Sequence, residues 1–274
     1  MKSVRRRQRT VPGLAGCPRA PIPRNPAFML AVEDLSRTYG ETVALDGATI
    51  TFAPGRIHAI LGENGSGKST LVKLLSGVVP PTRGAIRVDG RKVERYSPAM
   101  FQCLGIATVF QEVLSAPDRT ALDNIFLGGD GLLRRGVPRA RRLAIAAETL
   151  ASIATTRFDL EAPAGRLPLA ARQLVVLARA LVRRPRILIL DEVTAALDFA
   201  DRESVFQTME RFARGGGLIL FISHRMDEVQ RLADRVTVLR NGRVVETLDR
   251  ASVSPSEMLR LMAPAAAEEI ARGR

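Results

Sequence analysis

The residues with the clearest chemical meaning form the sequence GENGSGKST at positions 62–70. This sequence fits G-x-x-x-x-G-K-S, the pattern of a P-loop, in which backbone N–H groups bind phosphate oxygens. Its glycines allow backbone angles that are closed to other residues, so successive N–H groups can turn inward at a helix N-terminus. The motif predicts a phosphate-binding site made by Gly62, Glu63, Asn64, Gly65, Ser66, Gly67, Lys68, Ser69 and Thr70.

Two side chains of this loop have predicted roles of their own. The Lys68 ammonium would neutralise β- and γ-phosphate charge, and the Ser69 hydroxyl would coordinate Mg²⁺. The residues before the loop, 56–61, are typical of a short buried strand, and residues 70–77 have the leucine spacing of an amphipathic helix. A strand, a glycine loop and a helix are the context that the motif requires. The alternative, a glycine-rich turn with a surface lysine, would not need these flanks.

Two acidic residues follow a second apolar segment, ILILDE at positions 187–192. Its continuous hydrophobicity is typical of a strand buried on both faces. At the carboxyl end, Asp191 would hold Mg²⁺ directly or through water, and Glu192 would reach the water that attacks the γ-phosphate. An acid pair after a strand is a weak signal alone, because strand ends are commonly polar. After a P-loop, it favours catalysis.

Three further polar residues lie on or after predicted strands. His224 follows the apolar segment 218–223, where its imidazole could hydrogen-bond the γ-phosphate; a lone histidine is more often structural, but ligands bind at this edge of such sheets. Gln111 could reach Mg²⁺ or the attacking water, although a glutamine says little by itself. His58 lies inside the strand before the P-loop, and we interpret it as a packing residue.

Strand and helix patterns alternate along much of the chain, which implies an α/β fold with a largely parallel sheet and helices on its faces. We expect one domain over residues 28–262 with a helical insertion at about 114–183, a basic tail at 1–27 and an alanine-rich tail at 263–274. The predicted strands are 29–35, 49–52, 56–61, 85–88, 106–111, 187–190, 217–222 and 236–239. The predicted helices are 70–77, 139–154, 169–182, 201–213 and 226–232.

The net charge of +13 over 274 residues suggests an anionic partner at first sight. Seven of the excess positive charges lie in residues 1–27, however, and the chain has no tryptophan and no recognisable nucleic-acid motif, so we expect no nucleic-acid partner. No apolar run approaches the ~20 residues of a membrane-spanning helix, so any membrane role must come through a partner. Cys17 and Cys103 have no metal-like spacing and point to a reducing cytoplasm.

The N-terminal tail, rich in Pro, Gly and Arg, is predicted to be disordered. Its segment LAGC at 14–17 superficially resembles a lipoprotein cleavage site, but the apolar stretch before it is short and contains Pro12 and Gly13. A second possibility is that translation begins at Met29, since the chain from there opens directly on a strand.

Taken in order, the motifs from residue 29 to residue 262 resemble the ATP-binding subunit of ABC transporters. The resemblance implies a P-loop NTPase of ABC type with an antiparallel β subdomain, ATP and Mg²⁺ as ligands, and ATPase activity. It implies that Tyr39 stacks on adenine and that Asp198 belongs to the D-loop. The matching features are Tyr39, the Walker A loop 62–70, Gln111 of the Q-loop, the Walker B segment 187–192, Asp198 and the switch histidine His224.

Finer similarity points to the monosaccharide importers of the ribose and galactose type, through segments such as VFQE at 109–112 and ISHRMDEV at 222–229. Their typical subunit carries two ATP-binding halves, and this sequence resembles the N-terminal half, as a stand-alone relative or a fragment. The signature, an LSGGQ-like segment, falls on LPLAARQ at 167–173, where Pro168 replaces a serine whose hydroxyl would meet the γ-phosphate of a partner's ATP.

The resemblance implies an ATP-hydrolysing subunit of a membrane importer, for a sugar, at the cytoplasmic face of the cell membrane. Its partners would be a second ATP-binding domain, in a homodimer or heterodimer, a permease contacted through residues 112–127, and indirectly a substrate-binding protein. One alternative is a regulatory or assembly module that binds ATP but scarcely hydrolyses it. Another is the same ATPase with an amine, nucleoside or autoinducer-like cargo. Soluble DNA-repair or translation ATPases of this superfamily are disfavoured by the import-like segments.

Overall fold

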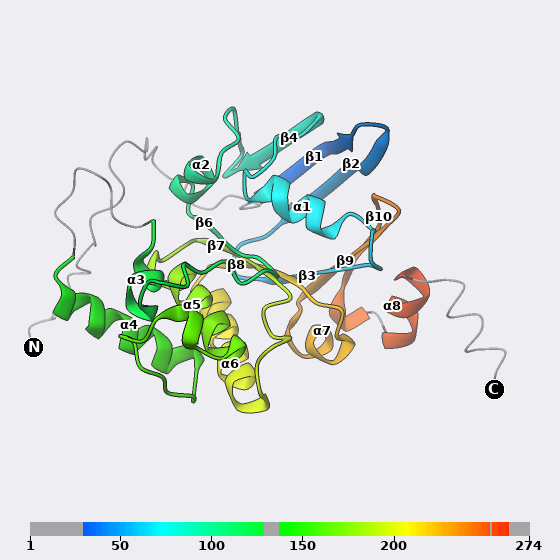
Figure 1. Cartoon of the computed structure of the whole chain (residues 1–274). Helices are drawn as coiled ribbons and strands as arrows, with labels where there is room; N and C mark the ends of the chain where they lie inside the picture. Colours follow the sequence, from blue (N-terminus) through cyan, green and yellow to red (C-terminus); the bar gives the residue numbers. More distant parts are fainter. Residues whose placement is uncertain (1–29, 129–136, 253, 263–274) are drawn as a thin grey trace, which may run out of the picture.

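The centre of the molecule is a six-stranded sheet with the strand order β10-β9-β3-β8-β7-β6 (Figure 1). The computed structural model describes residues 30–128, 137–252 and 254–262, so the predicted tails lie outside the described residues. The strands are β3 (Ile57–Leu61), β6 (Ile106–Val109), β7 (Ile187–Asp191), β8 (Leu218–Ile222), β9 (Arg235–Arg240) and β10 (Arg243–Asp249). All of them pair in parallel except β10, which is antiparallel to β9.

Every residue of β3, β7 and β8 is buried, which explains their uninterrupted apolar sequences. The predicted parallel sheet is therefore confirmed. Parallel strands place their carboxyl ends at one edge, and helices cover both faces, so this edge is where loops can present polar groups to a ligand.

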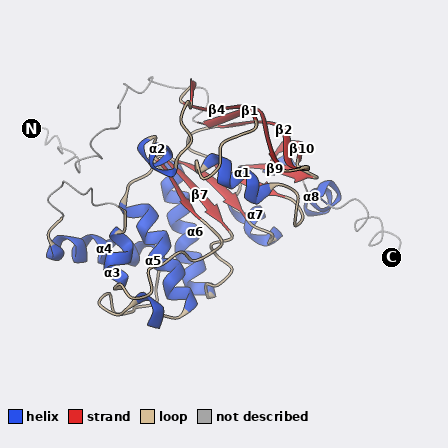
Figure 2. Cartoon of the chain, turned by 45° about the horizontal axis from the view of Figure 1, so that its top comes forward, coloured by secondary structure: helices blue, strands red, loops and turns tan. Residues whose placement is uncertain are grey.

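A second, four-stranded antiparallel sheet lies beyond helix α1 (Lys68–Leu75) and has the order β2-β1-β4-β5 (Figure 2). Its strands are β1 (Leu30–Tyr39), β2 (Thr42–Phe52), β4 (Arg83–Val88) and β5 (Arg91–Lys92). The sequence prediction ended β1 at residue 35 and began β2 at residue 49, which is wrong for both strands. They continue to a tight turn at Gly40, which has φ 57°, and their exposed polar positions weaken the apolar pattern there.

The remaining helices lie mainly on the opposite face of the central sheet (Figure 2). They include α3 (Ala121–Phe126), α4 (Arg139–Ile153), α5 (Leu169–Val182), α6 (Phe199–Arg214) and α7 (Met226–Leu232). The first three of these fall within the range 114–183 where a helical insertion is predicted. None of the helices in the described part of the chain is long and apolar enough to cross a membrane.

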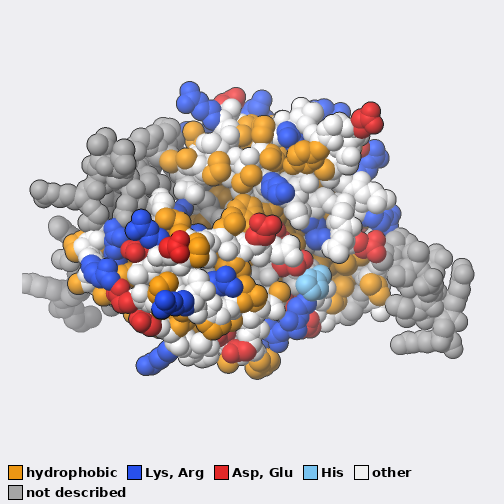
Figure 3. Space-filling view, in the orientation of Figure 1, with side chains coloured by type: hydrophobic (Ala, Val, Ile, Leu, Met, Phe, Trp, Pro, Cys, Tyr) orange, Lys and Arg blue, Asp and Glu red, His pale blue; other side chains and the backbone are white. Residues whose placement is uncertain are grey.

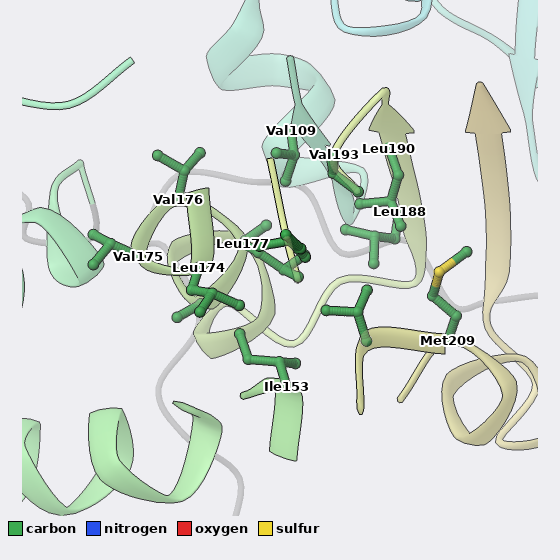
Figure 4. Close-up of a cluster of buried hydrophobic side chains, with 14 of the residues drawn as sticks. Val109, Ile153, Leu174, Val175, Val176, Leu177, Leu188, Leu190, Val193 and Met209 are labelled. Atoms are coloured by element: carbon green, nitrogen blue, oxygen red, sulfur yellow. The ribbon is translucent and has the colours of Figure 1, made fainter. Parts of the chain in front are cut away.

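Two large apolar clusters join these layers, and a smaller one packs α7 against β3 and β9. One packs α5 and α6 against β7 and contains Leu174, Leu177, Leu188, Leu190 and Met209 (Figure 4). The other packs α1 and the antiparallel sheet against the opposite face of the same strands, through residues such as Leu71, Ile187 and Ile189. Because both faces of β7 and β8 are covered, the position of their carboxyl ends is fixed by the core.

The predicted strands and helices omit β5, β10, α2 (Pro98–Cys103) and α8 (Pro255–Met262), and α3 was expected only as part of the helical insertion. Helix α2 begins at a Ser97 cap followed by Pro98, a recognisable start, but it is short. Strand β10 is at the sheet edge and only partly buried, so it lacks a continuous apolar run. One predicted strand also ends earlier than expected, since β6 stops at Val109 and leaves Gln111 in the following loop.

Candidate nucleotide-binding site

The carboxyl ends of four neighbouring strands bring the predicted site residues to one edge of the sheet. Strand β3 leads into the P-loop, and β7 ends with Asp191 and Glu192. Between them, β8 is followed by His224, and β6, on the far side of β7, is followed by Gln111. In this sheet β3 pairs in parallel with β8, β8 with β7, and β7 with β6. This pairing brings residues that are far apart in the sequence into one row.

The P-loop has the backbone that its glycines predict. Gly62, Gly65 and Gly67 have φ values of 155°, 81° and 104°, which lie in the range that side chains disfavour. A Cβ on Gly62 would be 2.3 Å from the Leu239 carbonyl oxygen, and one on Gly67 would be 2.8 Å from the Ala44 carbonyl oxygen. Both glycines are thus needed for close approach to neighbouring backbone. Gly65 faces open space, so only its φ requires glycine.

Neighbouring elements hold the P-loop in shape. The Gly242 N–H donates to the Ser66 carbonyl at 3.1 Å, and the Asp46 N–H donates to the Gly242 carbonyl at 2.8 Å. Arg243 pairs with the Asp46 carboxylate at 2.7 Å. The loop is therefore braced by the β9–β10 hairpin and by β2. The sequence did not predict this support, because its only local signal is the turn pair Asn241-Gly242.

Lys68 lies at the start of α1 and donates from Nζ to the carbonyl oxygens of Gly62 at 2.7 Å and Glu63 at 2.8 Å. Burial lowers the pKa of its ammonium, while the carboxylates of Glu192, Asp191 and Glu63 act in the opposite direction. Lysine therefore spans the loop and faces the acid pair of β7. A half-buried cation among loop N–H groups is suited to bind phosphate oxygens.

Two features of the loop fit a bound polyanion. Helix α1 has Gly67 as its N-cap, with no side-chain hydrogen bond to its first N–H groups, so these donors remain available for a ligand. The Ser66 side chain is 4% exposed, and its Oγ is buried without a hydrogen-bond partner in the described structure. Buried hydroxyls normally have a partner, and a phosphate oxygen would supply one.

The acid pair is held by its own neighbours. Gln111 Nε2 donates to Glu192 Oε2 at 3.1 Å, and His224 Nδ1 lies 3.3 Å from Glu192 Oε1. Glu192 has a left-handed backbone with φ 51°, and its side chain is 17% exposed. Strained backbone of this kind persists only where the surroundings determine it strongly. Three of the predicted catalytic side chains thus meet, and Glu192 is at their centre.

Asp191 has the electrostatics of a cation ligand. Its side chain is buried, and burial together with the negative charge of Glu192 raises the pKa of its carboxyl to about 6, against the opposing charges of Lys68 and Lys73. A carboxyl in this situation is stabilised as the carboxylate by a nearby cation. Oxygen atoms of Asp191, Ser69 and Gln111 are the donor types that Mg²⁺ prefers, so these residues fit that ion.

Figure 3 shows this face of the molecule, with acidic side chains near its middle and a histidine at the surface. Of the two histidines, His224 has a side chain that is 61% exposed, whereas His58 is 1% exposed. His58 is a packing residue, as predicted: Nε2 lies 2.7 Å from Thr237 Oγ1, and the ring meets the edge of Phe52.

Two predicted site residues do not join this cluster within the described residues. Tyr39 ends β1 and is 41% exposed, with the Arg37 guanidinium 4.6 Å from its ring centroid. Asp198 is the N-cap of α6, where its carboxylate accepts from the Asp201 N–H at 2.8 Å. One face of the Tyr39 ring is thus taken by a cation, and Asp198 is fixed at a helix end.

The signature-like segment 167–173 opens helix α5, as predicted. Pro168 is the N-cap with φ −54° and ψ 155°, and no side chain caps the helix. The next residue, Leu169, is 51% exposed. The helix N-terminus therefore presents uncapped N–H groups beside an exposed apolar side chain, and the serine hydroxyl of the family pattern is missing.

A P-loop and an aspartate-glutamate pair that lie together at the carboxyl edge of a parallel sheet define a P-loop nucleoside-triphosphate-binding protein. Within that class the chain belongs to the ABC transporter family, which matches residues 45–195. The fold agrees with solved cassettes of that family. A dimeric bacterial ABC transporter cassette, MJ0796, has a TM-score of 0.74 at 26% identity and covers 81% of this chain and 99% of its own. A bacterial Atm1-family ABC exporter with ATP bound has a TM-score of 0.73 at 26% identity, and the match covers 95% of this chain and 45% of the exporter chain.

Among curated relatives, the chain is similar to ribose import ATP-binding proteins. It is 42% identical over 237 residues to RbsA 1 of Rhizobium johnstonii, which covers 86% of this chain and 46% of the relative. It is 37% identical over 238 residues to RbsA 2 of Escherichia coli O157:H7, covering 87% and 47%. The chain thus spans about half the length of the curated relatives it matches.

Proposed function

We propose that this protein is an ATP-hydrolysing subunit that energises a membrane importer, and that its cargo is a sugar. The observation that carries the proposal is the convergence of Lys68, Asp191, Glu192 and His224 at one sheet edge, with Gln111 donating to Glu192 at 3.1 Å. The names of the relatives, ribose import ATP-binding proteins, support the sugar.

In this proposal each residue has a part in hydrolysis. The P-loop N–H groups and Lys68 bind the β- and γ-phosphates, and His224 contacts the γ-phosphate. Glu192 accepts the proton of the attacking water as the new P–O bond forms and the bond to the leaving ADP oxygen breaks. Ser69, Asp191 and Gln111 would hold Mg²⁺, which when bound neutralises phosphate charge. Tyr39 stacks on adenine with its free face.

The other wall of the site comes from a second ATP-binding domain. No hydrogen bond or ion pair in the described part of the chain links Asp198 or the N-terminus of α5 to Glu192, and in this proposal both groups act on the partner's nucleotide. ATP binding closes the pair of ATP-binding domains and hydrolysis opens it, and a permease follows this movement through contact with residues 112–127. A substrate-binding protein acts indirectly. The subunit therefore works at the cytoplasmic face of the membrane. We propose no nucleic-acid partner.

ATPase assays of the purified chain test the hydrolytic part of this proposal. We expect Mg²⁺-dependent release of phosphate that is lost in Lys68→Ala and kept in Lys92→Ala, an exposed lysine of β5. Turnover that persists in Lys68→Ala would contradict the site. Purification of the native complex tests the rest: a permease partner and stimulation by a sugar are expected, and recovery without any membrane subunit would contradict an importer.

A second candidate function is supported by Pro168 at the N-cap of α5. Loss of the signature hydroxyl removes a charge-assisted hydrogen bond of about 1.5–3 kcal/mol from the partner's site. In a homodimer both sites would be affected, which favours a module that binds ATP and regulates or assembles a complex with little turnover. Binding of ATP without measurable hydrolysis in the purified complex would select this function.

A further inference from the structure

Helix α7 places a fully buried carboxylate directly behind the candidate site. The Glu228 side chain is 0% exposed, although its neighbour Asp227 has a side chain that is 68% exposed. A carboxylate without hydrogen bonds is very unfavourable in a protein interior. The partners of Glu228 therefore determine why the chain keeps an acid at this position.

Its partners come from the two loops that carry Glu192 and His224. Glu228 Oε2 accepts from Thr194 Oγ1 at 2.9 Å and from Ser223 Oγ at 2.8 Å. Its other oxygen, Oε1, lies 3.5 Å from Arg225 Nε. Thr194 is two residues after Glu192, and the other two partners flank His224 on either side. One carboxylate thus connects the loop after β7 with the loop after β8.

These contacts act on backbone that needs outside support. Glu192 has φ 51°, a conformation that surroundings must impose on a residue with a side chain. On the other loop, Ser223 Oγ also accepts from the Arg225 N–H at 3.0 Å, which closes a small turn around His224. The same serine hydroxyl donates to Glu228, so the carboxylate of Glu228 fixes the orientation of this turn.

We propose that Glu228 is a positioning residue that holds Glu192 and His224 in register with each other. The proposal rests on the proposed function, in which both side chains act on the γ-phosphate and its water. Glu228 does not touch the reacting atoms. It acts by fixing the 3.3 Å approach of His224 Nδ1 to Glu192 Oε1 through the hydroxyls of Thr194 and Ser223.

The first test compares turnover with nucleotide affinity. In Glu228→Leu and in Thr194→Val, we expect kcat to fall by about 10-fold to 100-fold, because misplaced catalytic groups lose rate. The Kd for ATP should stay within about twofold, since the P-loop is braced elsewhere. Glu228→Gln should recover most of kcat, because its amide oxygen can accept both hydroxyl bonds. The control Asp227→Asn should leave both values unchanged.

The second test needs no catalysis and uses the fact that the chain has two histidines. Imidazole NMR of the full chain with labelled histidine should give one set of ring resonances for buried His58 and one for His224. Thr194→Val should move the His224 resonances and leave those of His58 in place. In a Glu228→Leu background, the same Thr194→Val change should add nothing further, because the connection is already broken.

The two tests separate the possible failures. A wild-type chain that does not hydrolyse ATP would contradict the proposed function, while the NMR test would still report on the connection. Wild-type kcat in both Glu228→Leu and Thr194→Val would overturn the positioning role. So would an undiminished effect of Thr194→Val in the Glu228→Leu background. If Glu228→Leu does not fold, Glu228→Ala takes its place in both experiments, and Ser223→Ala supplies the third point.

Discussion

At the scale of single residues, burial lowers the pKa of two basic groups, His58 inside β3 and Lys68 in the loop that follows this strand. Lys68 after this strand has a lowered pKa because it is partly buried, and neighbouring carboxylates limit that shift. His58 within the strand has no such compensation: burial and the positive charge of Arg235 lower its pKa from 6.5 to about 3. It therefore stays neutral in the folded protein where the unfolded chain would bind a proton.

This shift predicts a dependence of stability on pH. The lowered pKa of His58 makes the unfolded chain bind more protons between pH 6.5 and about 3, so stability is full above pH 6.5 and falls as the pH decreases. From pH 7 to pH 5 the titration of His58 lowers the free energy of unfolding by about 2 kcal/mol. His58→Gln should not show this decrease, as measured by urea unfolding at several pH values.

The comparison of the two proteins provides its own control. Carboxyl groups that titrate below pH 5 are common to both chains, so they cancel in the difference between the two unfolding curves. We expect this difference to change by about 2 kcal/mol between pH 7 and pH 5. Parallel pH dependences of the wild type and His58→Gln would show that His58 does not titrate as described.

The backbone of the P-loop could be predicted because one short segment contains its whole pattern. The P-loop needs particular residue types at adjacent positions, so GENGSGKST can be read directly. The braces of the loop could not be predicted, because Asp46, Gly242 and Arg243 come from distant strands. Glu228 was missed for the same reason: an acid on a short helix is commonly exposed, and only its folded partners distinguish it from Asp227.

At the scale of elements, helices α4 and α5 form a matched pair, because each begins with a proline N-cap that offers no side-chain hydrogen bond. Serine at such a position stabilises a helix by about 1 kcal/mol. Pro168→Ser and Pro138→Ser should therefore raise stability equally. Pro168→Ser alone should also increase ATP turnover of a homodimer about tenfold, by restoring a hydrogen bond to the partner's γ-phosphate.

Steady-state ATPase assays and thermal unfolding of the two variants provide the measurement. Equal gains in stability with a rate increase only in Pro168→Ser support a signature role for the start of α5. If both variants raise turnover to the same extent, the gain comes from general stabilisation and the signature role of Pro168 is wrong.

A second prediction at this scale concerns how α3 is attached to α5. Asn124 is fully buried on α3; its Nδ2 donates to the carbonyls of Ala116, Arg119 and Thr120, and its Oδ1 accepts from the Ala116 N–H and from Arg179. Asn124→Leu removes these five hydrogen bonds and takes the acceptor away from the Ala116 N–H and from Arg179 Nη2, so the free energy of unfolding should fall by about 3 kcal/mol. Denaturant unfolding measures this loss.

The control for this variant is Gln207→Leu on α6, where an exposed amide makes a single long contact with Glu203 at 3.5 Å. It should change stability by less than about 0.5 kcal/mol. A similar small change for Asn124→Leu would mean that residues 112–127, the proposed permease surface, are held on α5 by something other than this amide.

Element-scale prediction succeeded where one hydrophobic period runs without interruption. Strands β3, β7 and β8 are buried along their whole length, and their bounds were predicted to within a residue or two. Strand β2 was shortened and β10 was missed because their exposed positions carry polar residues, and pairing with β1 or β9 supplies the stability that the local pattern does not show.

At the scale of the whole molecule, the proposed function makes the ATP site one half of a composite. The cluster around Glu192 comes from this chain, whereas α5 begins at Pro168 with uncapped N–H groups available to a neighbour. Glu192→Gln should reduce hydrolysis at least 100-fold while ATP binding is kept. The bound nucleotide should then hold two copies together as a stable dimer, which size-exclusion chromatography with light scattering can detect.

Two further samples make this test decisive. Addition of Lys68→Ala to Glu192→Gln should abolish the ATP-dependent dimer, because the P-loop no longer binds the phosphates. ADP should not support the dimer either, since the γ-phosphate is missing. A Glu192→Gln chain that stays monomeric with ATP, yet binds it, would indicate that the second half of the site belongs to a different chain.

The bracing of the P-loop by Gly242 and the two carbonyl bonds of Lys68 has a thermodynamic consequence. The loop backbone is already organised before a nucleotide binds. Binding therefore replaces the carbonyl partners of Lys68 with phosphate oxygens and does not have to order a flexible segment. Little conformational entropy is lost on binding, and the association rate is not slowed by a folding step. The entropy cost of ordering the P-loop is thus part of the folding free energy of the protein, and each nucleotide binds to a loop that is already in its binding conformation.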